Sequence, residues 1–251
     1  MSSISLSYVS GQPHLVLTHR DWLGASIVCR LPEFVRSRDQ RERIFPGDVE
    51  TEIVRPGVEI RYRWSAPNQV KRRLQTDFHG HAWVEDDVVR FHLAGSVVGP
   101  EPGEPGLYLI CLQCGQHVAM QDQPTTRTYL RSGGRWRTVD ECVGSAGLPD
   151  HRMFGTGDPP VELDRALMAR VTENGWVVGI GIDGPGSVSS NHQPWPSCIH
   201  ANPAWPTLGA GEEATVRGVI HWFRGTLDEL WNKVQDEWPE AAPGDTPDDH
   251  A

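Results

Sequence analysis

Residues 58–64 alternate apolar and charged side chains at every second position, which is the period of a β-strand. An alternating strand buries one face in a core and leaves the other face in water. Similar runs occur at 15–18, 26–29, 88–94, 107–112, 126–131, 176–182 and 215–223. Short strands separated by turn-forming clusters predict an all-β protein folded as an antiparallel β-sandwich.

Composition agrees with a folded β protein. The 251 residues include 26 Gly and 20 Pro, which supply turns, and 38% hydrophobic residues, which suffice for a core. The glycines have no three-residue period and no heptad pattern occurs, so collagen and coiled coils are excluded. We expect a single β-sandwich domain over residues 1–239, because no long linker interrupts that range.

One helix is predicted, close to the C-terminus. Thr226 and Glu229 have the spacing of a capping box, in which each side chain satisfies a backbone N–H of the other residue. The apolar residues that follow at helical spacing are Leu227, Leu230, Trp231, Val234 and Trp238. This stripe predicts an amphipathic helix over 226–238 packed on the sheets, with Trp231 as an anchor, and Pro239 ends it.

The end of the chain is strongly acidic. Residues 240–251 have no apolar periodicity and are expected to form a disordered tail. The formal net charge is −10, and the six acids from Asp236 onward leave a net charge of only −4 for the rest. A body without a basic stripe is not expected to bind nucleic acid, because that affinity depends on neutralising phosphates.

The expected location is the cytoplasm. No segment approaches the ~18 consecutive apolar residues of a membrane span, and the first twelve residues lack the basic and apolar regions of an export signal. Five cysteines are an odd number in a chain too long to depend on disulfides, which is typical of a reducing compartment. No membrane partner is expected, and the oligomeric state is left open.

Residues 191–206 contain the densest group of unusual side chains. The polar and aromatic residues there are Asn191, His192, Trp195, Cys198, His200, Asn202 and Trp205, set among four prolines. Prolines hold an irregular loop at little entropic cost, and polar groups beside indole faces are typical of sugar recognition. The alternative is a Pro-rich loop in which the tryptophans plug one end of a sandwich.

A second group begins at Cys111, where the sequence reads Cys-x2-Cys-x2-His as far as His117. These three residues could bind zinc if the chain turned tightly, with Cys198 or His200 completing a tetrahedral set. In a continuous strand, however, Cys111 and Cys114 would point to opposite faces, whereas Cys111 and Gln113 would share one. Buried cysteines acting as small hydrophobic residues are the alternative.

A third group offers His79, His81 and Glu85, whose odd-numbered positions share one face of a strand. Two imidazoles and a carboxylate are a ligand set for a divalent metal, and the spacing resembles the first metal-binding motif of cupins. These residues are therefore metal candidates, with a solvent-facing His-x-His pair as the alternative. No other cofactor is predicted, because phosphate-loop, nucleophile-elbow and zincin motifs are absent and the glycines at 179 and 181 are typical of a strand and turn.

The order of motifs over residues 60–238 resembles uncharacterised bacterial β-sandwich proteins of the galactose mutarotase-like superfamily, the supersandwich fold. The segments that carry this resemblance are 111–113, 191–203, 209–212, 217–218 and the terminal helix, together with Asp122 and Arg127. Aldose epimerases of that superfamily have an Asn-His pair before an aromatic residue, and Asn191-His192 is the position that could correspond. The resemblance implies a carbohydrate epimerase, lyase or hydrolase.

These observations predict a carbohydrate-active protein that acts on a small-molecule or oligosaccharide substrate by histidine-assisted proton transfer. The expected catalytic residues are His192, His200, His117 and Asp122. The expected substrate-binding residues are Gln113, Arg127, Asn191, Trp195, Asn202 and Trp205. Gln113, His117, Arg127, His192 and His200 are predicted to line one pocket. The alternatives are a cupin-like metal-dependent enzyme using a His/Glu/Cys site and a non-catalytic carbohydrate-binding domain.

Overall fold

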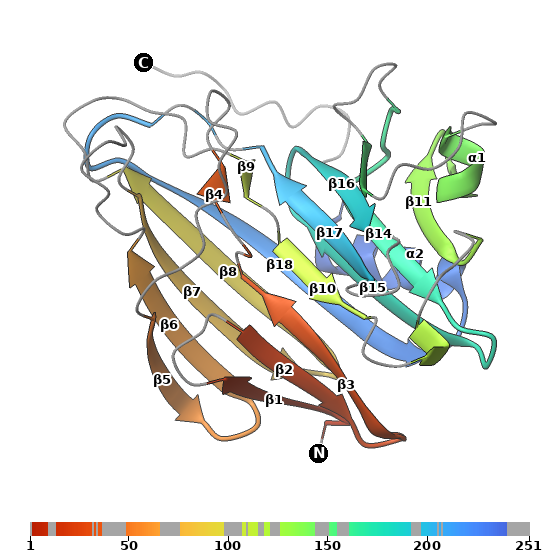
Figure 1. The fold of residues 1–251 in the computed structure, drawn as a ribbon, viewed down its shortest axis with the longest axis horizontal. Helices are drawn as coiled ribbons and strands as arrows, with labels where there is room; N and C mark the ends of the chain where they lie inside the picture. The colour runs from red at the N-terminus through yellow and green to blue at the C-terminus, as the bar shows by residue number, and fades with distance from the viewer. Residues whose placement is uncertain are drawn as a thin grey trace.

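The computed structural model consists of two large antiparallel sheets packed face to face (Figure 1). It describes residues 2–9, 14–31, 33, 35–36, 49–65, 76–97, 107–108, 110–114, 118–120, 126–143, 151–154, 161–191, 197–204, 206 and 208–239. The predicted all-β sandwich is confirmed. A small pair of strands, β4 (Val35–Arg36) and β9 (Leu107–Tyr108), lies beside the large sheets. The predicted tail at 240–251 lies outside the described residues.

The first large sheet has seven strands. In spatial order they are β1 (Ile4–Val9), β2 (His14–His19), β3 (Trp22–Arg30), β10 (Ile110–Gln113), β17 (Cys198–Pro203), β16 (Gly186–Asn191) and β13 (His151–Phe154). Strand β10 pairs with β3 on one side and β17 on the other, so three distant parts of the chain meet at the centre of this sheet.

The second large sheet has nine strands. In spatial order they are β12 (Arg135–Thr138), β11 (Thr128–Ser132), β14 (Leu167–Val171), β15 (Trp176–Ile182), β18 (Glu213–Arg224), β8 (Val88–Val97), β7 (Thr76–Glu85), β6 (Glu59–Ser65) and β5 (Val49–Arg55). Strand β6 contains the alternating segment, and it buries Ile60 and Tyr62 while Arg61 and Arg63 are exposed. The strand prediction is therefore confirmed for this segment, with Ile60 and Tyr62 on the core side.

The main core lies between the two sheets, where their inner faces meet. Leu17, Leu112 and Ile199 contribute from the seven-stranded sheet, and Phe91 and Ile180 contribute from the nine-stranded sheet. All five side chains are buried almost completely. Because side chains alternate along each strand, the residues next to these in sequence project from the opposite, outer face of their sheet.

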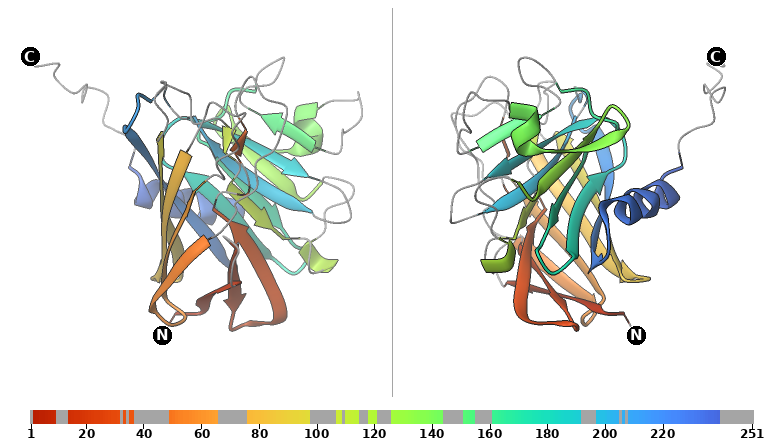
Figure 2. Two further views of the ribbon diagram at one scale, coloured as in Figure 1. Left: turned by 60° about the vertical axis from the view of Figure 1, so that its left-hand side comes forward. Right: turned by 90° about the vertical axis from the view of Figure 1, so that its right-hand side faces the viewer.

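Helix α2 (Leu227–Glu237) packs on the outside of the nine-stranded sheet, as the right-hand view of Figure 2 shows. The capping box is confirmed, because the Thr226 hydroxyl accepts a hydrogen bond from the Glu229 N–H and the Glu229 carboxylate accepts one from the Thr226 N–H. The helix buries Leu230 and Val234 in a second, smaller core. Trp231 is only partly buried there.

Two further helical segments are short and were not predicted from the sequence. They are the 3-10 turn η1 (Val118–Met120) and helix α1 (Val139–Val143). Helix α1 begins with a reciprocal pair of hydrogen bonds between Thr138 and Glu141, at the same spacing as the capping box of α2. With only five residues, α1 has no apolar stripe that could reveal it. No helix among the described residues is long and apolar enough to cross a membrane.

His221 provides a test of the core beneath α2. It pairs in register with Gly179, the glycine beneath Leu230, and burial lowers its pKa to about 3, with Lys233 and Arg90 adding to the effect. Because the unfolded chain takes up a proton near pH 6.5 and the folded chain does not, stability falls as pH drops from 6.5 toward 3. This site contributes about 1.4 kcal/mol per pH unit over that range.

The variant His221→Phe is therefore expected to lose less stability than the wild type on acidification. Between pH 6.5 and 4.5, the difference in the change of unfolding free energy is expected to be about 2 kcal/mol. Denaturant unfolding at several pH values measures it, with His79→Phe, an exposed position on the same sheet, as the control. Parallel pH profiles of wild type and His221→Phe would contradict the prediction.

Candidate functional site

The outer face of the seven-stranded sheet is lined with polar side chains at its centre, and we call it the polar sheet face. Its residues are Arg30, Cys111, Gln113, Ser187, Ser189, Asn191, Cys198, His200 and Asn202. The strand register explains this gathering, since Cys111 lies opposite both Arg30 and His200, and Gln113 lies opposite Cys198. Polar groups on four adjacent strands therefore share one surface.

Most of these polar groups are shielded from solvent. His200 is 2% exposed, Asn202 is 1% exposed and Gln113 is 6% exposed. Buried polar groups need hydrogen-bond partners, because an unsatisfied one costs about 1–3 kcal/mol. The Asn202 Oδ1 atom nevertheless has no hydrogen-bond partner among the described residues.

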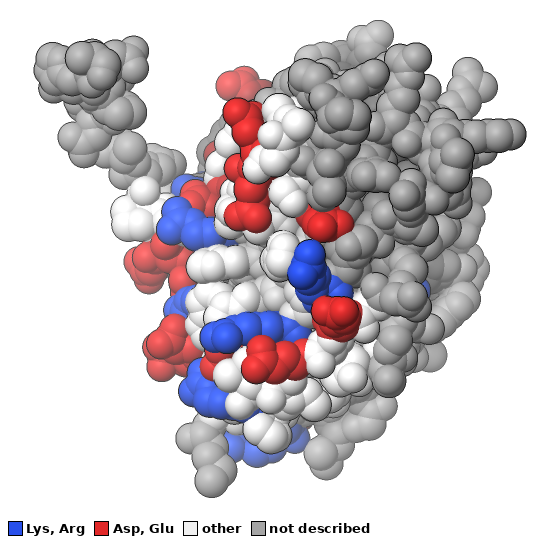
Figure 3. All heavy atoms as spheres, turned by 90° about the vertical axis from the view of Figure 1, so that its left-hand side faces the viewer, with Lys and Arg blue, Asp and Glu red and all other residues white. Residues whose placement is uncertain are grey.

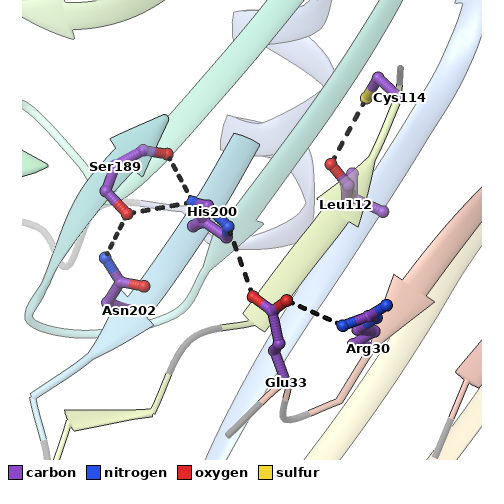
Figure 4. Close-up of polar contacts among 7 residues, drawn as sticks. All are labelled: Arg30, Glu33, Leu112, Cys114, Ser189, His200 and Asn202. Carbon is purple, nitrogen blue, oxygen red and sulfur yellow. Dashed lines mark hydrogen bonds and ion pairs between the residues drawn. The ribbon is translucent and has the colours of Figure 1, made fainter. Parts of the chain in front are cut away.

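His200 is at the centre of a polar chain that Figure 4 shows. Its Nδ1 atom lies 3.1 Å from both the carbonyl oxygen and the hydroxyl of Ser189. Its Nε2 atom lies 3.7 Å from Glu33 Oε2, and the other Glu33 oxygen accepts a 2.9 Å hydrogen bond from Arg30. Asn202 donates to the Ser189 hydroxyl at 3.3 Å. The imidazole is therefore held from both sides.

Two thiols lie next to this histidine. The Sγ atoms of Cys111 and Cys198 and a ring nitrogen of His200 all lie within 4.8 Å of one another, and all three residues are buried. A hydrogen bond from the Cys111 thiol holds the pKa of Cys198 well below its usual value, with His200 and Arg170 adding to the effect. Burial and then the Cys198 sulfur raise the pKa of Cys111 well above its usual value.

The charge of Cys198 in turn affects His200. Burial alone would lower the pKa of His200, but the Cys198 sulfur, Glu33 and the Ser189 carbonyl raise it, and the net shift is upward. The Cys198 sulfur therefore favours a proton on His200, and His200 in turn favours the loss of the Cys198 proton.

Arg170 is a buried cation that sequence reasoning missed. It projects from β14 and is 1% exposed, and its guanidinium donates to the Met120 carbonyl, the Ser197 hydroxyl and the Thr128 hydroxyl. Among the described residues no carboxylate forms an ion pair with it. Its positive charge lies near Cys198 and favours the thiolate there. No local pattern marks this residue, because its buried surroundings are created only when the two sheets pack.

The structure brings together four of the residues expected at the site from sequence. Gln113, Asn191, Asn202 and His200 all belong to the polar sheet face. Arg127 lies elsewhere, beside β11 of the nine-stranded sheet, where its guanidinium is 3.3 Å from the Glu173 carboxylate. The remaining predicted residues, His117, Asp122, His192, Trp195 and Trp205, lie outside the described residues.

The three metal candidates on β7 do not converge. His81 Nε2 lies 2.9 Å from a Glu59 oxygen, and Glu85 forms an ion pair with Arg90 at 3.3 Å. His79, His81 and Glu85 do share one face of the strand. However, Trp83 lies between His81 and Glu85, and two residues four positions apart on a strand are separated by about 13 Å. A shared face was the correct inference, and the separation along the strand prevents a common ion.

The outer face of the nine-stranded sheet contains a groove of about 570 Å³. His79, His81 and His92 line it together with arginines and glutamates of β5 and β6. Figure 3 shows that acidic and basic side chains are interspersed on this side of the molecule. For the residues described, this surface has no patch of one sign that would favour a polyanion.

Cys114 is separate from the Cys111 cluster, as strand alternation predicts. Its thiol donates a 3.6 Å hydrogen bond to the Leu112 carbonyl and packs in the main core. All five cysteines are free thiols. The set of neighbouring sulfur and nitrogen ligands in the described part of the chain is therefore Cys111, Cys198 and His200, and Cys114 is not in it.

Comparison of the sequence with protein-family models and with curated proteins finds no match. Solved structures with this fold are nevertheless found at low sequence identity. A galactose mutarotase-like protein from Lactobacillus casei is 9% identical with a TM-score of 0.56, and the match covers 89% of this chain and 98% of that one. A protein from Synechocystis is 7% identical with a TM-score of 0.58, covering 89% and 93%.

A third similar structure is the α-N-acetylgalactosaminidase NagBb from Bifidobacterium bifidum in complex with GalNAc. It is 11% identical with a TM-score of 0.60, and the match covers 94% of this chain but 38% of that larger one. At this level of identity the likeness shows the fold alone. The chain has the galactose mutarotase-like sandwich fold, which these comparisons associate with carbohydrate-related proteins.

Proposed function

We propose that this protein acts on a saccharide bound at the polar sheet face, with His200 as the group that transfers a proton. The single observation that supports this most strongly is a buried imidazole fixed by Ser189, beside an Asn202 oxygen that has no partner among the described residues. The fold adds support, because one protein that shares it is a glycosidase solved with a bound sugar.

The polar contacts of His200 define how it would act. The Ser189 carbonyl can only accept a hydrogen bond, so it holds the proton on Nδ1 and leaves Nε2 as the atom that exchanges a proton with the substrate. Glu33, itself paired with Arg30, lies beside Nε2 and stabilises the imidazolium when it forms. Epimerases, lyases and hydrolases all require such a transfer to a sugar carbon or oxygen.

Other residues have proposed roles in binding and proton transfer. The amides of Asn202, Asn191 and Gln113 would hydrogen-bond sugar hydroxyls, since amides offer both donors and acceptors. Five further residues that the sequence analysis expected at the site lie outside the described residues and also have proposed roles. His192, His117 and Asp122 would take part in proton transfer, and Trp195 and Trp205 would stack on the sugar ring.

Replacing His200 with glutamine tests the proposal. Glutamine keeps a polar side chain but cannot transfer a proton at neutral pH, so turnover is expected to fall by about 100-fold or more. Galactose, glucose and N-acetylgalactosamine are the probes for anomer exchange, and their 4-nitrophenyl glycosides are the probes for cleavage. The matched control is His79→Gln, an exposed histidine on the other sheet.

The outcomes separate the alternatives. Loss of turnover with retained sugar binding and an unchanged melting temperature supports the proposal. Saturable sugar binding without any turnover in the wild type would instead favour a non-catalytic binding domain. Full turnover in His200→Gln would overturn the role of the histidine.

A further inference from the structure

We propose that Cys111, Cys198 and His200 form a binding site for one thiophilic divalent cation of the Zn²⁺ class. Their three ligand atoms already lie within 4.8 Å of one another. Around tetrahedral zinc, bond lengths of about 2.0–2.3 Å place neighbouring ligand atoms about 3.5–3.8 Å apart. The three side chains therefore need only small rotations to meet a common ion.

The two strands that carry the ligands make this arrangement rigid. Cys198 and His200 are two residues apart on β17, so both project from the same face. Cys111 lies directly opposite His200 on β10, within the centre of the seven-stranded sheet. Ligands on paired central strands are fixed by the backbone hydrogen bonds, so the site needs no folding of a loop.

The orientation of His200 is the independent observation that points to a metal. Metal-binding histidines generally donate their second ring N–H to a carbonyl or carboxylate, which fixes the ring and the tautomer. The Nδ1 atom of His200 has this contact with the Ser189 carbonyl at 3.1 Å. The Nε2 atom is then directed away from Ser189, on the side of the ring where Glu33 lies.

Two thiolates and an imidazole are a soft ligand set that selects Zn²⁺ over Mg²⁺ or Ca²⁺. The Glu33 carboxylate, with one oxygen 3.7 Å from the Nε2 atom, is an oxygen donor placed to fill the fourth position. Arg30 already pairs with Glu33, so the negative charge of the Glu33 carboxylate is balanced locally. Burial of all three ligands excludes water competition for the ion.

Metal binding would regulate the same site, and this part of the inference rests on the proposed function. A cation bound at Nε2 occupies the atom that would transfer a proton to the sugar. The metal-free and metal-bound chains are therefore alternative states, of which only the metal-free one can use His200 in proton transfer.

Cobalt binding to the full-length chain tests the site. Protein purified without a His tag, reduced with a phosphine and stripped by a chelator is titrated with Co²⁺. About one equivalent is expected to bind, with thiolate-to-cobalt charge-transfer absorption and the intense visible bands of a tetrahedral ion. Zn²⁺ should displace it and bleach both features. X-ray absorption of the Zn²⁺-loaded wild type should show two sulfur ligands at about 2.3 Å.

Variants assign the ligands. Cys198→Ser, Cys111→Ser and His200→Gln should each weaken Co²⁺ binding by about 100-fold or more, judged only for variants that keep the wild-type circular dichroism spectrum. Cys114→Ser is the matched control, because this buried thiol lies outside the cluster and should retain wild-type binding. The X-ray absorption result on the wild type decides the case even where a variant fails to fold.

The failures of the two proposals are distinguishable. Absence of the charge-transfer absorption, or its loss in Cys114→Ser but not in Cys198→Ser, overturns the metal site regardless of any activity. If the ion binds through both thiols but Zn²⁺ leaves saccharide turnover unchanged, the metal site stands and the proton-transfer role of His200 is overturned. Inhibition by Zn²⁺ that a chelator reverses supports both.

Discussion

Replacing Leu230 with alanine is expected to lower the free energy of unfolding by about 3–4 kcal/mol. Leu230 is completely buried at the centre of the contact between α2 and the nine-stranded sheet. Its methyl groups rest on Gly179, so closely that a Cβ atom at that glycine would lie 2.6 Å from Leu230 Cδ2. The sheet beneath is rigid and cannot collapse into the space, so the substitution leaves a cavity.

Denaturant unfolding measures this loss, with Leu227→Ala as the matched control. Leu227 belongs to the same helix and the same apolar stripe but is only partly buried, and its truncation is expected to cost about 1 kcal/mol. Trp231 is also partly buried, with the Arg131 guanidinium 4.2 Å from its ring centroid. If Leu230→Ala cost less than about 1 kcal/mol, α2 would be peripheral to the stability of the fold.

The second large effect is expected at Gly80. The ring of Tyr62 lies across this glycine, and a Cβ atom there would be 1.7 Å from Tyr62 Cζ, which is far inside any contact distance. Tyr62 is buried between the sheets, so its ring cannot move aside without displacing core neighbours. Gly80→Ala is therefore expected to destabilise the protein by about 3 kcal/mol through overpacking.

A double-mutant cycle separates this clash from a loss of backbone flexibility. In a Tyr62→Leu background the smaller side chain leaves room, so Gly80→Ala should cost at least about 1.5 kcal/mol less than in the wild type. Gly209→Ala serves as a control, because its nearest neighbours are the atoms of a flexible Glu212 carboxylate. Equal costs in both Tyr62 backgrounds would show that the ring is not responsible.

The candidate site shows what the alternation of side chains along a strand can predict and what it cannot. Strand alternation was enough to place Cys111 and Gln113 on one face and Cys114 on the other. The same reasoning placed His81 and Glu85 on one face, but a shared face does not imply proximity. The His81 imidazole pairs with Glu59, and the Glu85 carboxylate pairs with Arg90. Alternation determines the face of the sheet to which a side chain points, but it does not determine which residues of other strands lie beside it.

The neighbours depend on strand pairing. Cys111 meets His200 because β10 pairs with β17 across 89 positions of sequence, and the register between them is set by which residues the whole core buries. Glu33 and Arg170 reach the same region from other parts of the chain, and neither belongs to a recognisable motif. The sequence pattern grouped Cys111 with Cys114 and His117 and offered Cys198 or His200 as a fourth ligand. The structure instead places both Cys198 and His200 beside Cys111 and puts Cys114 in the core.

The sequence by itself determined the class of fold, the strand β6 and the capped helix α2. These features depend on interactions between residues two to four positions apart, and such interactions are visible as periodicity and capping pairs. Only the tertiary structure decided the sheet order, the burial of Arg170 and the meeting of two thiols with His200. Those features arise when distant strands pack to bury a common core, a global condition that no short segment of the chain encodes.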